Sequence, residues 1–148
     1  MVKRLCILIS FLIFFLGVRL TSAEIAQVYA PKEIQILDFI LVSSNQNEEI
    51  LTKTFKLKVE NKNQEPLYNL KMTLIHSSDQ AIIEEGEVYL GTINPGQIII
   101  SDDEFSYSID TNKIKMKPQI DLHWKVEYED ANGEKIGEAL VREEYWAS

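Results

Sequence analysis

Strict alternation of apolar and polar side chains over residues 119–129 is the feature that most constrains the fold. The apolar positions are Ile120, Leu122, Trp124, Val126 and Tyr128, and the polar positions between them are Asp121, His123, Lys125, Glu127 and Glu129. Successive side chains of a β-strand point to opposite faces, so this pattern predicts a strand with one face in a core and the other in water. Such a strand needs a second layer that covers its apolar face.

Further runs with a period of two predict seven strands in all, at residues 33–42, 51–61, 68–75, 87–93, 98–109, 119–129 and 135–143. Residues 24–32 are predicted as a short leader and 43–49 as a polar turn. Asn94-Pro95-Gly96 and Asn132-Gly133 have the composition of tight turns. The all-β fold class expected from this pattern is a seven-stranded antiparallel immunoglobulin-like β-sandwich, with a small barrel as the alternative.

Two interruptions of the alternation predict local irregularities. The apolar positions of the first strand change phase at Leu37-Asp38, where we expect the strand to switch sheets. The run that begins at Ile98 is broken by Ser101-Asp102-Asp103 before it resumes at Phe105. A polar interruption that shifts the phase of a strand predicts a β-bulge.

Residues 1–23 have the composition of a helical signal peptide. Lys3 and Arg4 precede an apolar run over 5–16, and Thr21-Ser22-Ala23 fits the small-residue cleavage pattern. The expected domain is therefore 24–148, exported to the periplasm, the cell surface or the medium of a bacterium. An uncleaved signal would be its only contact with a membrane. Cys6, within the apolar run, is the single cysteine, so the domain itself has neither a disulfide nor a thiol nucleophile.

Charge narrows the range of partners. Three of the 15 basic residues and none of the 23 acidic residues lie in 1–23, which gives the predicted domain a formal charge of −11. Because nucleic acid and anionic membranes would repel such a surface, we expect neither as a partner. A cationic partner or calcium remains compatible with it.

Three segments resemble bacterial immunoglobulin-like modules of the CARDB and DUF11 kind. They are Asn61 with Pro66-Leu67-Tyr68-Asn69-Leu70-Lys71-Met72-Thr73-Leu74, then Leu90-Gly91-Thr92-Ile93-Asn94-Pro95-Gly96-Gln97, and then Ser101-Asp102-Asp103-Glu104-Phe105. The stretch that contains them, residues 61–105, is about a third of the chain. The resemblance implies an exported sandwich fold, in a family that includes adhesins, surface spacers and accessory domains of enzymes.

Few residues carry recognisable chemistry. Asp102, Asp103 and Glu104 are weak candidates for calcium ligands, and Tyr145 and Trp146 are weak candidates for contact with a partner or a sugar. His76 and His123 are predicted to be separate surface residues, and no Ser-His-Asp set or phosphate-binding glycine loop is present. We expect no enzymatic activity and no cofactor. The predicted function is protein–protein interaction by a non-catalytic domain, and the alternative is carbohydrate or calcium binding.

Overall fold

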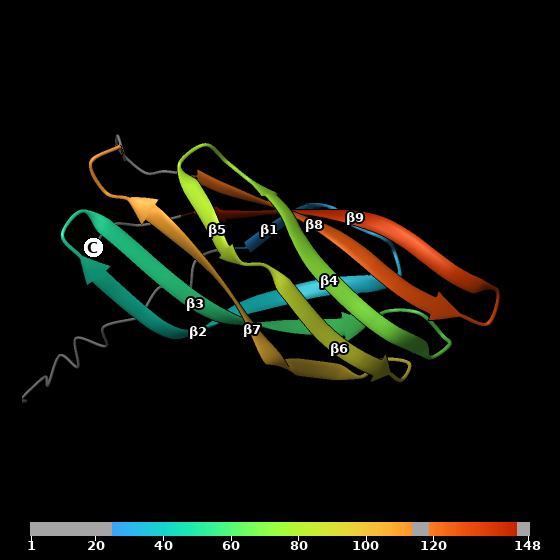
Figure 1. Ribbon diagram of the computed structural model, residues 1–148. Helices are drawn as coiled ribbons and strands as arrows, with labels where there is room; N and C mark the ends of the chain where they lie inside the picture. Colours follow the sequence, from blue (N-terminus) through green and yellow to red (C-terminus); the bar gives the residue numbers. More distant parts are fainter. Residues whose placement is uncertain (1–24, 114–118, 145–148) are drawn as a thin grey trace, which may run out of the picture.

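The computed structural model describes residues 25–113 and 119–144, which form two antiparallel sheets packed face to face (Figure 1). The strands are β1 (Ile25–Tyr29), β2 (Ile34–Asn47), β3 (Ile50–Asn61), β4 (Leu67–Ser77), β5 (Ala81–Glu85), β6 (Glu87–Ile93), β7 (Ile98–Asp110), β8 (Gln119–Asp130) and β9 (Gly133–Glu144). These residues include no helix, and hence none that is long and apolar enough to cross a membrane. The all-β prediction is confirmed.

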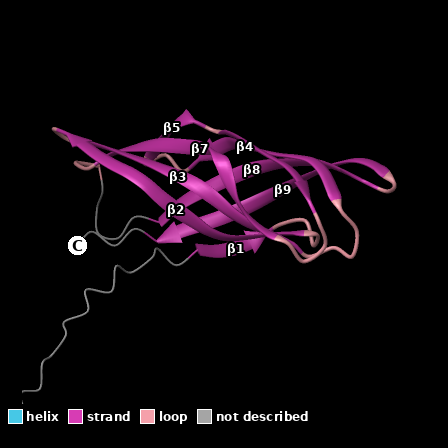
Figure 2. Ribbon diagram, turned by 90° about the horizontal axis from the view of Figure 1, so that it is seen from below, coloured by secondary structure: helices cyan, strands magenta, loops and turns pink. Residues whose placement is uncertain are grey.

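The first sheet has the strand order β9-β8-β4-β6, and the short β1 extends it beyond β9; the second sheet has the order β2-β3-β7-β5. Seen from below, the strands of the two sheets cross one another (Figure 2). The two predicted antiparallel layers are confirmed, whereas the predicted number of seven strands is too small. The two unpredicted strands, β1 and β5, have five residues each, and a run of that length hardly reveals a period.

The predicted core strand is confirmed as β8. Ile120, Leu122, Trp124 and Val126 are all fully buried. The indole of Trp124 meets the ring of Phe105 edge-on, with ring centroids 4.9 Å apart. The polar residues of the alternation lie on the other side of the strand, so the five-stranded sheet has one face in the core and one in water.

The polar turn predicted at residues 43–49 is wrong. β2 continues to Asn47, which pairs with Ile50 of β3, so only Glu48 and Glu49 form the turn. Residues 44–50 are all exposed. Because this end of the hairpin has no core face, its sequence shows no apolar alternation, and its polar composition is that of a loop.

The β-bulge predicted in the fifth strand is confirmed in β7. Lys56 pairs with Glu104 and Lys58 pairs with Ile100, so residues 101–103 lie opposite Leu57 alone. The buried Ser101 hydroxyl accepts the Leu57 N–H at 3.0 Å and donates to the Asp103 carbonyl at 2.6 Å. A side chain thus replaces the ladder contacts that the bulge interrupts.

The sheet switch predicted at Leu37-Asp38 is wrong, although the phase change there is real. The register of β2 and β3 shifts between Ile36 and Asp38, which marks a bulge within one sheet. The change of sheet comes earlier, since β1 pairs with β9 and β2 pairs with β3. A bulge and a switch both reverse the facing of later side chains, and sequence alternation alone does not distinguish them.

Gly86 lies where the chain crosses from the four-stranded to the five-stranded sheet, between β5 and β6. A β-carbon there would lie 2.9 Å from the Leu74 carbonyl oxygen and 3.1 Å from the Leu74 β-carbon. We expect Gly86→Ala to lower the free energy of unfolding by about 1–3 kcal/mol, because the backbone must move to admit the methyl group. Urea denaturation measures the change. Glu84→Ala, at an exposed position of β5, is the control and should stay within about 0.5 kcal/mol of the parent.

Candidate functional site

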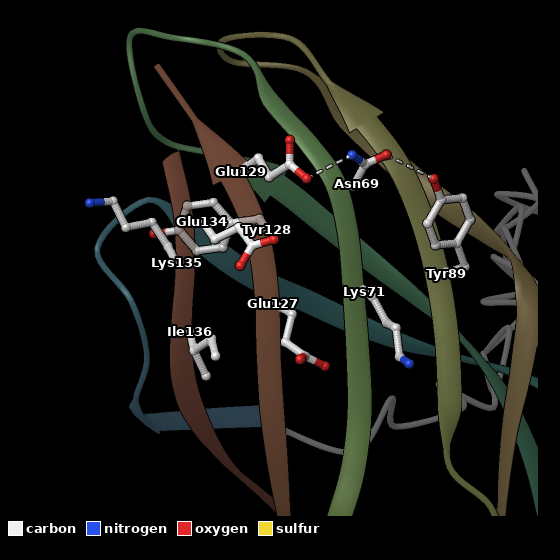
Figure 3. Close-up of a pocket in the computed structure, with 9 residues that line it drawn as sticks. All are labelled: Asn69, Lys71, Tyr89, Glu127, Tyr128, Glu129, Glu134, Lys135 and Ile136. Atoms are coloured by element: carbon white, nitrogen blue, oxygen red, sulfur yellow. Dashed lines mark hydrogen bonds between the residues drawn. The ribbon is translucent and has the colours of Figure 1, made fainter. Parts of the chain in front are cut away.

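A shallow hollow of about 260 Å³ lies on the outer face of the five-stranded sheet (Figure 3). Its lining residues come from four strands and are Asn69, Lys71, Tyr89, Glu127, Tyr128, Glu129, Glu134, Lys135 and Ile136. We call this surface the outer-face hollow. Apart from the buried Tyr128, its lining side chains are exposed or half-buried, so a molecule bound there would contact four strands of the sheet.

One row of paired residues crosses the outer-face hollow from edge to edge. Tyr89 of β6 pairs with Lys71 of β4, Lys71 pairs with Glu127 of β8, and Glu127 pairs with Ile136 of β9. Tyr89 is 52% exposed and Ile136 is 70% exposed. The row therefore has an aromatic side chain at one end and an aliphatic side chain at the other, with the charged Lys71 and Glu127 between them.

Asn69 fixes the upper end of the outer-face hollow. Its amide donates to Glu129 Oε1 at 3.1 Å, and its carbonyl oxygen accepts the Tyr89 hydroxyl at 3.3 Å (Figure 3). Both ladders of β4 shift register near this residue, and its φ is +51°. Asparagine tolerates this left-handed conformation better than most residues. The bulge thus turns the Asn69 side chain toward its partners on two neighbouring strands.

Three carboxylates (Glu127, Glu129 and Glu134) and two lysines (Lys71 and Lys135) line the outer-face hollow. Lys71 lies 3.1 Å from Glu87, and Lys125 lies 2.7 Å from Glu127. The Lys125 hydrogen bond is the main cause that lowers the pKa of the Glu127 carboxyl, and the charge of Lys71 adds to it. Glu129 and Glu134 pair directly across β8 and β9, where like charges repel. A cationic group of a ligand would relieve this repulsion.

Tyr128 is one of the residues that line the outer-face hollow, but its side chain belongs to the core. Burial raises the pKa of its phenol to about 12, assisted by the charges of Glu33 and Asp130. The folded protein therefore keeps a proton that the unfolded chain loses near pH 10. By linkage, this contribution to stability is fully present below pH 10 and is lost as the pH rises toward 12.

We expect Tyr128→Phe to flatten the fall of the unfolding free energy between about pH 10 and 12, since phenylalanine has no phenol to titrate. Urea denaturation at several alkaline pH values measures the slope for the parent and the variant. Tyr68→Phe, at an exposed tyrosine of the same sheet, is the control and should keep the parental slope. Equal slopes for Tyr128→Phe and the parent would contradict the assignment.

Of the acidic residues predicted as calcium ligands, Asp102 and Asp103 lie in the bulge of β7, and Glu104 follows it and pairs with Lys56. Asp102 and Asp103 are exposed, and Glu104 is partly buried. One carboxylate oxygen of Asp103 accepts the Tyr89 N–H at 2.9 Å, which ties the bulge to the strand that carries the aromatic side of the outer-face hollow. Within the described ranges, no three acidic, histidine or cysteine side chains are grouped for a metal ion. The alternative function, calcium binding at these residues, is therefore tested by the effect of the ion on thermal stability.

For calcium, we expect no change in melting temperature when the ion replaces a chelator in the buffer. Calcium takes six to eight oxygen ligands, and Asp103 already uses one of its oxygens on Tyr89. Thermal unfolding followed by circular dichroism measures the effect. A rise in melting temperature that Asp102→Asn removes would instead establish the bulge as a calcium site.

The other two sets of predicted site residues have different outcomes. Tyr145 and Trp146 lie outside the described residues. His76 and His123, predicted to be separate, face each other across β4 and β8. Sequence reasoning missed the outer-face hollow. The available signal was that Tyr89 and Ile136 are large apolar residues that do not fit a regular series of inward-facing positions.

Fold and site together define a two-sheet, all-β sandwich with a hollow on the outer face of one sheet. The sequence matches no protein-family model. A search of curated proteins also found no match. Among solved structures, the chain is similar to a crystal structure of a FixG-related protein from Vibrio parahaemolyticus, with a TM-score of 0.30 and 16% identity over 82% of this chain and 94% of that one. At these values the similarity assigns neither a family nor a function.

Proposed function

We propose that the chain is an exported, non-catalytic immunoglobulin-like domain that binds another protein at the bacterial cell envelope or surface. The observation that carries the proposal is the outer-face hollow, where the exposed Tyr89 and Ile136 flank a polar centre. Exposed aromatic and aliphatic side chains beside satisfied polar groups are typical of protein interfaces.

Among two-sheet all-β folds, the immunoglobulin-like topology is supported by the pairing of the strands. The two sheets have the orders β2-β3-β7-β5 and β1-β9-β8-β4-β6, and antiparallel sheets that share one core characterise that class.

The predicted signal segment supports export. Export would be tested by sequencing the amino terminus of the protein secreted by its own cells. A mature chain that begins at Glu24 is the expected result.

Electrostatics favour a partner with exposed lysine or arginine. Glu129 and Glu134 lie side by side without an ion pair to any described residue. A basic side chain could rest its aliphatic stem on Ile136 and place its charge between these carboxylates. Such pairing gives specificity and a faster approach of the partner more than it gives affinity.

Carbohydrate binding is the second candidate, and one observation favours it. Tyr89, Asn69 and Glu129 form a hydrogen-bonded set beside an exposed ring. Sugars bind to polar groups of this kind and stack on aromatic faces. Binding on a glycan array that Tyr89→Ala abolishes would support this function in place of the first.

Cross-linking of the full chain to an envelope extract, followed by mass spectrometry, tests the proposed function. The test variant combines Tyr89→Ser with Ile136→Ser, and Ile82→Ser is the matched control because Ile82 is 66% exposed on the other sheet. We expect the parent and the control to cross-link the same partner through β4, β6, β8 or β9, and the test variant to lose it. A protein set that is identical for all three chains would refute the proposal.

A further inference from the structure

We propose that His76 and His123 form a binding site for a transition-metal ion of the zinc and copper class on the outer face of the five-stranded sheet. The proposal is independent of the outer-face hollow and of the function inferred from it. It rests on the pairing of two strands that are far apart in the sequence.

The register of β4 and β8 places the two histidines directly opposite each other. Leu74 pairs with Trp124 just before them, and Ser77 pairs with Leu122 just after them. Residues that lie opposite in an antiparallel pair have β-carbons about 4.5–5.5 Å apart. That separation allows two imidazole rings to meet at one point.

Burial on either side shows that both rings point outward. Leu122 and Trp124 are fully buried, so His123 between them faces the solvent side of β8. On β4, Leu74 and Ser77 are buried, whereas Ile75 and His76 between them are exposed. The register shifts between Leu74 and His76, and this extra residue is what keeps His76 on the same face as His123.

Imidazole chemistry selects the class of ion. Neutral imidazole suits zinc, copper and nickel, whereas calcium and magnesium prefer oxygen ligands. Zinc–nitrogen bonds are about 2.0–2.1 Å long, so two rings on opposite strands can share one ion. His76 is exposed and His123 is half-buried on the same face, so an ion can approach both rings from solvent.

The surroundings define this as a two-ligand site. Asp121 is the acidic residue nearest to His123 along the outer face of β8, and its carboxylate is held by Arg142 at 2.8 Å. The remaining coordination positions of the ion would therefore go to water or to donors of another molecule. The rigid part of the site is the strand pair, which is anchored from below by the buried Trp124 and Leu122.

Isothermal titration of the full chain, made without a polyhistidine tag, tests the proposal with zinc chloride. We expect one zinc ion per chain, and at least tenfold weaker binding for His76→Ala and for His123→Ala. Asp79→Asn, an exposed acidic change in the turn after β4, is the control and should bind as the parent does. Magnesium chloride should give no heat of binding.

A nuclear magnetic resonance titration of the parent chain needs no variant and covers the case in which a substitution alters folding. Zinc is expected to shift the ring protons of His76 and His123 together and at the same ion concentration. Absence of binding at millimolar zinc, or equal binding by the parent and the double variant, would overturn the proposal. Ring shifts at one histidine alone would also overturn it.

Discussion

Trp124→Ala is expected to lower the free energy of unfolding by about 3–5 kcal/mol, which is the usual cost of removing a large buried aromatic side chain. Because small domains are stable by about 5–15 kcal/mol, a loss of this size leaves a marginal fold. Urea denaturation followed by circular dichroism measures the change. The midpoint should fall while the fold at low urea remains all-β.

The reason lies in the position of Trp124 between the two sheets. It is fully buried on β8, it meets Phe105 of β7 edge-on at 4.9 Å, and it lies 6.3 Å from the ring of Phe39 on β2. Its removal would leave a cavity bordered by rings of the four-stranded sheet, and these rings are too rigid to fill it. Edge-to-face pairs also contribute about 0.5–1.5 kcal/mol beyond the area that they bury.

His123→Ala is the matched control, since His123 is the sequence neighbour of Trp124 and lies on the opposite, solvated face. Its effect should stay within about 0.5 kcal/mol. Equal effects of the two substitutions would contradict the two-layer arrangement, because they would mean that the two faces of β8 are equally important to the core.

The core was predictable from sequence because buried and exposed residues alternate along a single strand. On β8, each inward residue is followed by an outward one, and nothing interrupts the period between Ile120 and Tyr128. The bulge of β7 was predictable for the same reason, since Ser101-Asp102-Asp103 breaks an otherwise regular run. Hydrophobic burial at every second residue is a signal that one strand carries by itself.

The candidate sites were not predictable because they depend on register between distant strands. His76 meets His123 only because β4 has an extra residue at Ile75, and nothing in the local sequence marks that position. The outer-face hollow likewise depends on the left-handed Asn69, which turns its side chain toward Tyr89 and Glu129. Sequence analysis named the two histidines but expected them to lie apart, and it did not single out Tyr89 or Asn69 as site residues.

Asn61→Ala is expected to lower the free energy of unfolding by about 2–4 kcal/mol, because it leaves buried backbone groups without their hydrogen bonds. Asn61 is fully buried at the end of β3. Its amide donates to the Glu65 and Ile93 carbonyl oxygens, both at 2.9 Å, and its side-chain oxygen accepts the Asn63 N–H at 2.8 Å.

These bonds join the two sheets at one end of the sandwich. β3 belongs to the four-stranded sheet, and Ile93 ends β6 of the five-stranded sheet. The backbone of Asn61 also bonds to Gln97 and Gly96 in the turn after β6. One residue thus holds the 62–66 loop and the 94–97 turn against each other.

Asn61→Asp separates the donor role of the side chain from its shape. Aspartate can still accept the Asn63 N–H, but it presents oxygen to the Glu65 and Ile93 carbonyl oxygens. We therefore expect a loss of stability at least as large as that of Asn61→Ala. Gln64→Ala, at an exposed position of the same loop, is the control and should change the unfolding free energy by less than about 0.5 kcal/mol. If Asn61→Asp kept the parental stability, the amide would not be the group that joins the two sheets.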